Sequence, residues 1–270
     1  MDLDDRHVVV TGAGRGIGAA LARRFHADGA RVVLADLPSD QLGALAASLD
    51  AERPGTSVAV VADVATEAGN VALIDAARHV FGEIDLFFAN AGVGAGSDPI
   101  TATEQDWEIS FAVNVHAHRW AAKHLLPNWL ARGHGYFCST ASAAGILAQL
   151  GSAPYSVTKH AAVAFAEWIS ITYGDAGIRV TCLCPQGVNT AMLRAGDTPG
   201  AGISSATVRA AGAVLEPEDV ADAAALAIAE ERFLVLPHPE VRTYAEVRAG
   251  DHERWLAGMR RLQSRMSGHR

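Results

Sequence analysis

The sequence predicts an α/β protein in which helices cover both faces of a parallel sheet. Short apolar runs alternate with segments long enough for helices, from about residue 7 to residue 236. The runs are apolar at successive positions, as in strands that bury both faces. A glycine-rich turn, residues 11–18, separates the first run from a helical pattern. These observations favour a doubly wound α/β fold.

The first half of the chain alternates strand and helix. Strands are expected in the apolar runs 7–11, 31–36, 57–61 and 84–89. Helices are expected in the segments between them, where apolar residues recur at helical spacing, at 17–25, 39–52 and 66–81. A long helix, 104–131, is expected after a capping sequence, Thr101-Ala-Thr-Glu104.

The second half continues this pattern and then departs from it. We expect strand 135–139, helix 152–174 and strand 178–183. Residues 185–215, rich in Pro, Gly, Ala and Ser, are too long for an ordinary connection and are expected to form a substrate loop. Pro217 and the two acidic residues after it suit the first turn of helix 217–229. Residues 233–236 complete a sheet of seven strands.

Residues 237–270 are expected to form a helical tail. Pro237 and Pro239 end the seventh strand, and a first helical pattern follows. A second helix is expected after Asp251, a candidate N-cap. Its apolar stripe consists of Trp255, Met259, Leu262 and Met266. We expect this stripe to dock near residues 191–215 of its own subunit or of a neighbour, with an unrelated outer face as the alternative.

Composition and charge exclude several classes of protein. The 270 residues are 50% hydrophobic, which supports a large core in one domain spanning 1–270. A net charge of −8 gives no electrostatic reason to expect nucleic acid or an anionic membrane as a partner. No apolar run reaches the roughly 18–20 residues of a membrane span, and no signal-peptide h-region is present. We expect a soluble, cytoplasmic protein.

Cysteine and histidine indicate neither a disulfide framework nor a metal site. Cys182 and Cys184 alternate in a strand-like run, as buried thiols do. His116, His118 and His124 lie on one expected helix without a carboxylate or cysteine pattern of metal ligands. No metal held by the protein is expected.

The glycine-rich turn indicates a dinucleotide site. Between a strand and a helix, glycines allow backbone N–H groups to approach a pyrophosphate closely. The spacing is Thr-Gly-x-x-x-Gly-x-Gly, with Gly12, Gly16 and Gly18, because Ile17 replaces a glycine of the commoner Gly-x-Gly-x-x-Gly pattern. Asp36, at the end of the second strand, is placed to accept hydrogen bonds from the adenosine ribose hydroxyls.

Tyr155 and Lys159 are catalytic candidates. Four residues apart on a helix, they share one face with Cβ atoms roughly 5–6 Å apart. A neighbouring cation favours phenolate, so the pKa of Tyr155, ordinarily about 10, is expected to fall towards neutrality. Tyr155 would then donate or accept a proton near neutral pH. The alternative is that the two residues only share a helix.

These motifs, in this order, resemble the short-chain dehydrogenase/reductase family from about residue 5 to residue 236. The shared motifs are the residue 11–18 turn, Asp63-Val64, Asn90-Ala91-Gly92, Asn114 in Val-Asn-Val, Ser142 with Gly145, Tyr155-x-x-x-Lys159, and Pro185 to Thr190. The resemblance implies a single Rossmann-like, doubly wound domain with a seven-stranded parallel sheet.

The resemblance also implies residue roles. Tyr155 would be the general acid/base, and Lys159 would hold the nicotinamide ribose and lower the pKa of the tyrosine. Ser142 would hydrogen-bond the reacting oxygen; the family's spacing selects it over the hydroxyls at positions 139 and 140. Asn114 would order a proton-relay water. The expected cofactor-binding residues are Gly12, Arg15, Gly16, Ile17, Gly18, Asp36, Leu37, Asp63, Val64, Asn90, Ala91, Gly92, Tyr155, Lys159, Pro185, Gly187, Val188 and Thr190.

Two features depart from the family pattern. The usual Pro-Gly after the sixth strand is Pro185-Gln186-Gly187, which puts a side chain near the nicotinamide edge. The glycine-rich carboxyl end common in the family is replaced by an Arg-rich tail. The family pattern therefore does not indicate which residues form the rear wall of the substrate site.

The leading interpretation is an NAD(H)-dependent oxidoreductase that interconverts a secondary alcohol and a ketone. Asp36 favours NAD because it would meet a 2′-phosphate with like charge. Arg15 supports the alternative, an NADPH-dependent ketoacyl or ketone reductase. A non-catalytic dinucleotide-binding regulator is a further alternative, against which the complete catalytic set argues. Apolar residues in the 185–215 loop indicate a mainly apolar small-molecule substrate.

A homo-oligomer is expected, most simply a homotetramer, with a homodimer as the alternative. Helices 104–131 and 152–174 carry more apolar residues than one sheet face needs. These residues are Trp120, Trp129, Phe165, Trp168 and Ile171. Members of the resembling family pair these helices across a two-fold axis.

Overall fold

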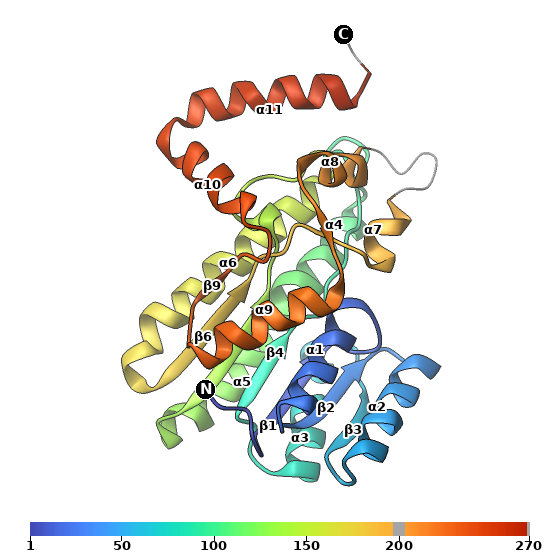
Figure 1. Cartoon of the computed structure of the whole chain (residues 1–270), viewed down its shortest axis with the longest axis vertical. Coiled ribbons are helices and arrows are strands. Elements are labelled where there is room, and N and C mark those ends of the chain that lie inside the picture. Colours follow the sequence, from blue (N-terminus) through green and yellow to red (C-terminus); the bar gives the residue numbers. More distant parts are fainter. Residues whose placement is uncertain (197–202, 269–270) are drawn as a thin grey trace.

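The computed structural model describes residues 1–196 and 203–268 (Figure 1). Its centre is a sheet of seven parallel strands in the order β3-β2-β1-β4-β5-β6-β9, which confirms the predicted fold class. The strands of this sheet are β1 (His7–Thr11), β2 (Arg31–Asp36), β3 (Ser57–Val61), β4 (Leu86–Ala89), β5 (Gly135–Thr140), β6 (Ile178–Leu183) and β9 (Leu234–Val235).

Helices cover both faces of the sheet, because successive strand residues point to opposite sides. Val8 and Val10 of β1 pack into one hydrophobic cluster, and Val9 packs into the other. The first cluster lies under α1 (Gly16–Ala27), α2 (Asp40–Glu52) and α9 (Pro217–Ala229). The second lies under α3 (Glu67–Phe81), α5 (Ala117–Arg132) and α6 (Ala153–Tyr173).

The expected single α-helix at 104–131 is wrong, since a π-helical turn interrupts it. The structure has α4 (Glu104–Phe111), the π-turn η1 (Ala112–His116) and then α5. The capping box is formed by Thr103 and Asp106 rather than from Thr101. The π-turn contains Asn114, one of the expected site residues, and π-turns are frequent at functional sites.

The expected loop at 185–215 contains regular structure where it is described. Gly187–Val188 (β7) and Val214–Leu215 (β8) pair as a second, two-stranded parallel sheet. Between them lie α7 (Ala191–Ala195) and α8 (Ser204–Ala211), while residues 197–202 of this loop fall outside the described residues. Two 3₁₀ turns, η2 (Ala143–Gly145) and η3 (Gly174–Ala176), occur elsewhere.

The tail forms two helices, as expected, α10 (Glu240–Gly250) and α11 (His252–Met266). Asp251 caps α11 by accepting a hydrogen bond from the backbone N–H of Arg254 at 2.9 Å. The Tyr244 hydroxyl of α10 donates to the carbonyl oxygen of Ala211 at 3.0 Å, which fixes α10 against α8. Figure 1 shows α11 crossing the end of the molecule beyond α8 and α10.

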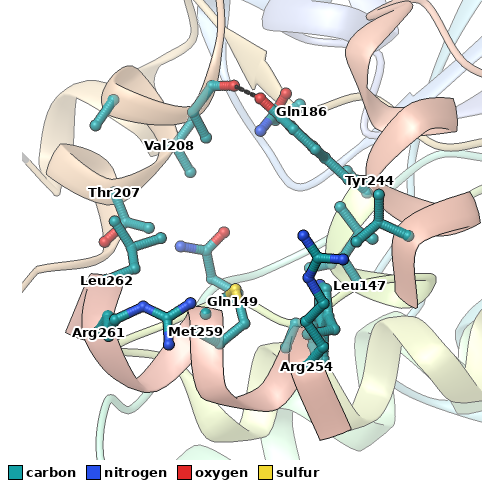
Figure 2. Close-up of a pocket in the computed structure, with 18 residues that line it drawn as sticks. Leu147, Gln149, Gln186, Thr207, Val208, Tyr244, Arg254, Met259, Arg261 and Leu262 are labelled. Atoms are coloured by element: carbon teal, nitrogen blue, oxygen red, sulfur yellow. Dashed lines mark hydrogen bonds between the residues drawn. The ribbon is translucent and has the colours of Figure 1, made fainter. Parts of the chain in front are cut away.

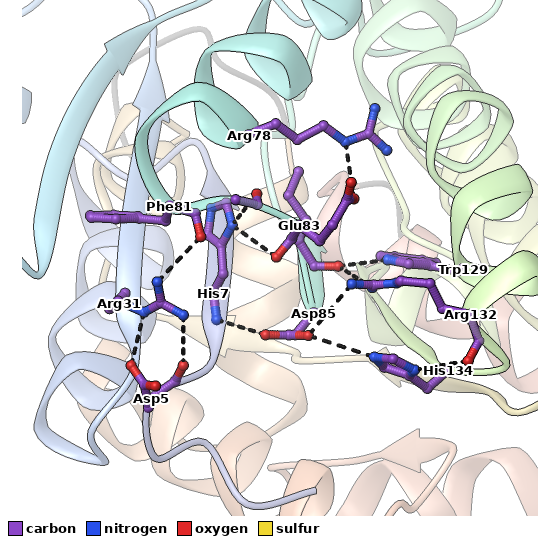
Figure 3. Close-up of polar contacts among 12 residues, drawn as sticks. Asp5, His7, Arg31, Arg78, Phe81, Glu83, Asp85, Trp129, Arg132 and His134 are labelled. Atoms are coloured by element: carbon purple, nitrogen blue, oxygen red, sulfur yellow. Dashed lines mark hydrogen bonds and ion pairs between the residues drawn. The ribbon is translucent and has the colours of Figure 1, made fainter.

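A group of polar contacts lies at the amino ends of strands β1 and β4 (Figure 3). The backbone N–H of His7 donates to Asp85 Oδ2 at 3.0 Å. The carbonyl oxygen of Ile84 accepts hydrogen bonds from Trp129 Nε1 at 2.7 Å and from Arg132 at 2.8 Å. These contacts explain why β4 begins at Leu86 rather than at residue 84. They also leave the carboxyl edge of the sheet available for a site.

Among the described residues, no helix is long and apolar enough to span a membrane.

Candidate active site at the carboxyl edge of the sheet

The glycine-rich turn joins β1 to α1 at the carboxyl edge. Gly12 and Gly16 have positive φ angles of 65° and 55°, which glycine adopts without strain. A Cβ on Gly18 would lie 2.0 Å from the carbonyl oxygen of Gly12, so the turn and the helix approach as only glycine allows. Ile17, half-buried, packs on the core beneath the turn. The backbone at the start of α1 can therefore cradle a pyrophosphate.

Asp36 lies beside this turn at the end of β2. Its Oδ2 accepts a hydrogen bond from the backbone N–H of Gly14 at 2.8 Å, and its Oδ1 accepts one from Leu37 N–H at 2.8 Å. The carboxylate is thus held at the point expected for a ribose contact. Arg15 and Leu37 are exposed next to it. At the end of β3, Asp63 is exposed and accepts from the next backbone turn, at Ala65 N–H.

Asn90 ties three strand ends together. Its Nδ2 donates to the carbonyl oxygen of Thr11 at 2.9 Å, and its Oδ1 accepts from the Thr140 hydroxyl at 3.0 Å. The next residue, Ala91, lies against the glycine-rich turn, since a Cβ on Gly12 would be 2.9 Å from Ala91 Cα. These contacts hold one wall of a groove along the sheet edge.

The groove leads to Lys159, which is buried on α6. Lys159 Nζ donates to the carbonyl oxygen of Thr140 at 2.8 Å. A Cβ on Gly92 would lie 3.3 Å from this Nζ and 3.3 Å from Asn114 Oδ1, so the three residues meet. Burial lowers the pKa of Lys159 to about 8.

Tyr155 lies one helical turn before Lys159, whose Nζ is 5.6 Å from the centroid of the phenol ring. Burial raises the pKa of Tyr155, and a hydrogen bond with the Ser142 hydroxyl acts in the opposite direction. The expected fall in the pKa of Tyr155 is therefore wrong for this structure. The physical reason is burial, which disfavours the phenolate, while the Lys159 ammonium bonds to the Thr140 carbonyl oxygen.

Ser142 and Asn114 are held by the backbone around them. The Ser142 hydroxyl accepts from Ala144 N–H at 3.1 Å and donates to the Pro185 carbonyl oxygen at 3.3 Å. Asn114 Oδ1 accepts from Val93 N–H at 2.9 Å, while its Nδ2 donates to the Val93 carbonyl oxygen at 2.9 Å and to the Thr158 hydroxyl at 3.0 Å. The π-turn thus positions Asn114 between the sheet edge and α6.

The segment from Pro185 to Thr190 returns towards the glycine-rich turn. A Cβ on Gly16 would lie 3.2 Å from Thr190 Cγ2, so the two expected cofactor contacts face each other. Pro185, Gly187 and Val188, which lead from β6 to Thr190, are buried. Val64, the remaining expected contact, is half-buried after β3. The expected dinucleotide and catalytic residues consequently line one edge of the sheet.

A family model described as short chain dehydrogenase matches residues 6–199. The chain belongs to the short-chain dehydrogenase/reductase family. Curated relatives include the 1-deoxy-11-beta-hydroxypentalenate dehydrogenase of Streptomyces exfoliatus, 35% identical over 90% of this chain and 86% of the relative. The meso-2,3-butanediol dehydrogenase of Serratia marcescens is 34% identical over 71% of this chain and 75% of the relative.

Solved structures of this family resemble the fold closely. A Burkholderia phymatum short-chain dehydrogenase/reductase in complex with NAD has a TM-score of 0.85 and 32% identity, covering 94% of this chain and 96% of its own. The L-sorbose reductase of Gluconobacter frateurii, complexed with NADPH and L-sorbose, has a TM-score of 0.77 and 26% identity, covering 87% and 97%. The protein is therefore an oxidoreductase with a fold that binds a nicotinamide dinucleotide.

Sequence reasoning missed His238, which shapes the Gln186 loop. The buried ring accepts a hydrogen bond from Gln186 N–H through Nδ1 at 3.1 Å, and its Nε2 donates to the Gly187 carbonyl oxygen at 2.9 Å. The available signal was a histidine between two prolines directly after the last strand. This histidine accounts for how the chain accommodates Gln186 where a Pro-Gly pair is usual.

A cavity of about 430 Å³ adjoins Ser142 (Figure 2). Ala143 and Ala144, which follow Ser142 in the chain, form one wall with residues 147–149, and α8, α10 and α11 form the other walls together with Gln186. The apolar stripe of α11 therefore faces the 191–215 segment across the cavity, close to the expected docking place. The contact is looser than expected, because no residue of α11 is fully buried.

Proposed function

We propose that the protein interconverts a secondary alcohol and a ketone, with NAD(H) as cofactor and Tyr155 as general acid/base. The observation that carries the proposal is the meeting of Tyr155, Lys159, Ser142 and Asn114 beside the glycine-rich turn. Relatives named as a butanediol dehydrogenase and a levodione reductase support an alcohol or ketone as substrate. The apolar walls of the cavity support a mainly apolar one.

The residues fit a nicotinamide dinucleotide. Gly12 and Gly16 give the turn positive φ angles, which bring its backbone to the start of α1, and Asp36 stands where ribose hydroxyls would be recognised. When bound, the nicotinamide supplies the hydride acceptor in oxidation and the hydride donor in reduction.

The protein's own groups handle the substrate oxygen and its proton. Ser142 would orient the reacting oxygen by hydrogen bonding. Tyr155 would take the hydroxyl proton during oxidation and return it during reduction. The Lys159 ammonium would stabilise the phenolate and bind the nicotinamide ribose, and Asn114 would order a water that passes the proton to solvent.

NAD is the proposed cofactor because Asp36 would repel a 2′-phosphate. The alternative is an NADPH-dependent ketone reductase, for which Arg15 is the specific observation: it is exposed directly beside the turn and could pair with a phosphate. Similar solved structures carry NAD in one case and NADPH in another. We place Asp36 first because its carboxylate is already fixed at the turn by Gly14 and Leu37.

The test is an oxidation assay with a panel of secondary alcohols and with NAD or NADP. We expect reduced cofactor to form with NAD, and Tyr155→Phe to abolish turnover while NAD binding is retained. The phenylalanine keeps the ring and removes only the proton-transfer group. Binding of NAD without turnover of any alcohol, or of any ketone in reverse, would favour the regulator; a Tyr155→Phe variant with more than about a tenth of the activity would exclude Tyr155 as the base.

A further inference from the structure

The cavity beside Ser142 combines apolar walls with two cationic side chains. Val208 of α8 and the α11 residues Trp255, Met259 and Leu262 supply apolar surface. Arg254 and Arg261, two turns apart on α11, line the same cavity. Figure 2 shows the Arg254 guanidinium extending towards the cavity and the Arg261 guanidinium lying along α11.

Two other polar side chains of the walls, Gln149 and Tyr244, have partners within the protein, whereas Gln186 Oε1 is buried and has no hydrogen-bond partner among the described residues. Gln149 Nε2 donates to the carbonyl oxygens of Leu150 and Ser204 at 3.2 Å and 3.1 Å. The Tyr244 hydroxyl donates to Ala211, as described above. Among the described lining residues, no side chain is acidic. Positive charge therefore faces an apolar space with nothing to balance it there.

Neither Arg254 nor Arg261 forms a side-chain hydrogen bond or ion pair within residues 1–196 and 203–268. Both are exposed, so the free guanidinium groups are open to a ligand. Arg260 and Arg265 lie on the same helix but do not line the cavity. Arg260 and Arg265 can therefore serve as control positions for Arg254 and Arg261, which line the cavity.

We propose that the cavity binds an apolar alcohol or ketone that carries a carboxylate, and that Arg254 and Arg261 bind this carboxylate. The inference rests on the proposed function and specifies its substrate class. A guanidinium matches a carboxylate through two parallel hydrogen bonds, and the apolar walls match a hydrocarbon body. The reacting carbon would lie at Ser142, while α11 would hold the acidic end.

Binding is tested without turnover, using octanoate and octanamide with the full chain in the presence of NAD. Calorimetry should show octanoate binding about tenfold or more tightly than octanamide. The variant Arg254→Gln/Arg261→Gln should lose this difference, because glutamine keeps hydrogen bonding and removes the charge. The control variant Arg260→Gln/Arg265→Gln should keep it. Equal binding of the two probes, or equal loss in both variants, would overturn the proposal.

Kinetics separates this inference from the proposed function. Oxidation of 7-hydroxyoctanoate should have a kcat/KM about tenfold or more above that of 7-hydroxyoctanamide, and the Arg254→Gln/Arg261→Gln variant should remove the advantage mainly through KM. If both alcohols are oxidised equally well by wild type, the anion site is overturned and the proposed function stands. If neither alcohol is oxidised while octanoate still binds through the two arginines, the anion site is supported and the proposed alcohol dehydrogenase function is refuted.

Discussion

Burial shifts the pKa values of Tyr155 and Lys159 in opposite directions, because it disfavours phenolate and ammonium alike. The pKa of Lys159 falls to about 8 while that of Tyr155 rises. As pH rises, Lys159 therefore loses its proton earlier than an ordinary lysine, and Tyr155 keeps its proton longer than an ordinary tyrosine.

The rate of alcohol oxidation should depend on the protonation state of Tyr155. Oxidation needs Tyr155 to accept the hydroxyl proton, and the deprotonated fraction of Tyr155 grows with pH, so the oxidation rate should rise between about pH 6 and pH 9. Steady-state kinetics across this range checks the rise. A flat profile, with a deuterium isotope effect showing that hydride transfer limits the rate, would count against Tyr155 as the base.

Asp36 should decide the cofactor. Wild type should prefer NAD by roughly a hundredfold in kcat/KM, as a like-charge mismatch of a few kcal/mol implies. Asp36→Asn removes the charge and keeps one side-chain acceptor, so this preference should fall by about tenfold, mainly through better use of NADP. Asp40→Asn, an exposed acidic residue on α2, is the control. Unchanged preference in Asp36→Asn would shift the explanation to Arg15.

At the scale of elements, strands and most helices were predictable because burial imposes a repeating apolar pattern. The π-turn at 112–116 was not, since one extra residue in a turn barely changes the apolar spacing. Its position follows from tertiary contacts, through which Asn114 reaches Val93 and Thr158. The candidate site residues were expected from ordered motifs, and the structure places them along one edge of the sheet. His238 was missed, because its role depends on a tertiary contact with the backbone N–H of Gln186.

The contact between α5 and β5 should make stability depend on pH. His118 Nδ1 lies 3.0 Å from the Ser139 hydroxyl, and burial, with Lys159 nearby, lowers the pKa of His118 to about 3. Because its ordinary value is 6.5, the unfolded chain binds more protons between these values, and the free energy of unfolding falls as pH is lowered through this window. Above pH 6.5 the contribution is complete.

His118→Asn should weaken this dependence by up to about 1.4 kcal/mol per pH unit. Urea unfolding of both proteins at about pH 4.5, 5.5 and 6.5 measures the slopes. Parallel slopes would show that His118 is protonated in the folded protein.

Helix α11 should act on the substrate and not on the dinucleotide, since it lines the cavity and lies away from the glycine-rich turn. Deleting residues 251–270 should raise substrate KM several-fold and leave the KM for NAD nearly unchanged. α10 is retained in this truncation, so its contacts to Ala211 and Ile146 persist. An unchanged substrate KM in a stable truncated protein would show that α11 contributes only to packing.

For the whole molecule, the exposed apolar residues on the outer face of α6 indicate where two subunits could pack. Trp168 and Ile171 are 55% and 83% exposed, so part of the apolar excess expected on these helices does reach the surface. Trp129 is instead a core residue at 1% exposure, where its indole N–H donates a hydrogen bond to the Ile84 carbonyl oxygen. The periodic pattern marks apolar positions on a helix, but does not by itself separate core from interface.

We predict a homotetramer, or else a homodimer, that buries this face. Light scattering at micromolar concentration should give a particle larger than the 28.2 kDa chain, and Ile171→Glu should shift the population towards monomer. Ile100→Glu, also exposed but on a loop, is the control. A monomeric wild type would refute the assembly.

In the proposed reaction, hydride passes directly between a substrate carbinol carbon and NAD while Tyr155 moves the proton. It is tested by incubating wild type and Tyr155→Phe with NAD and a secondary alcohol deuterated at the carbinol carbon, and weighing the reduced cofactor by mass spectrometry. Wild type should form NADH that carries one deuterium, and Tyr155→Phe should form almost none. Reduced cofactor without deuterium, or equal formation by the variant, would contradict it.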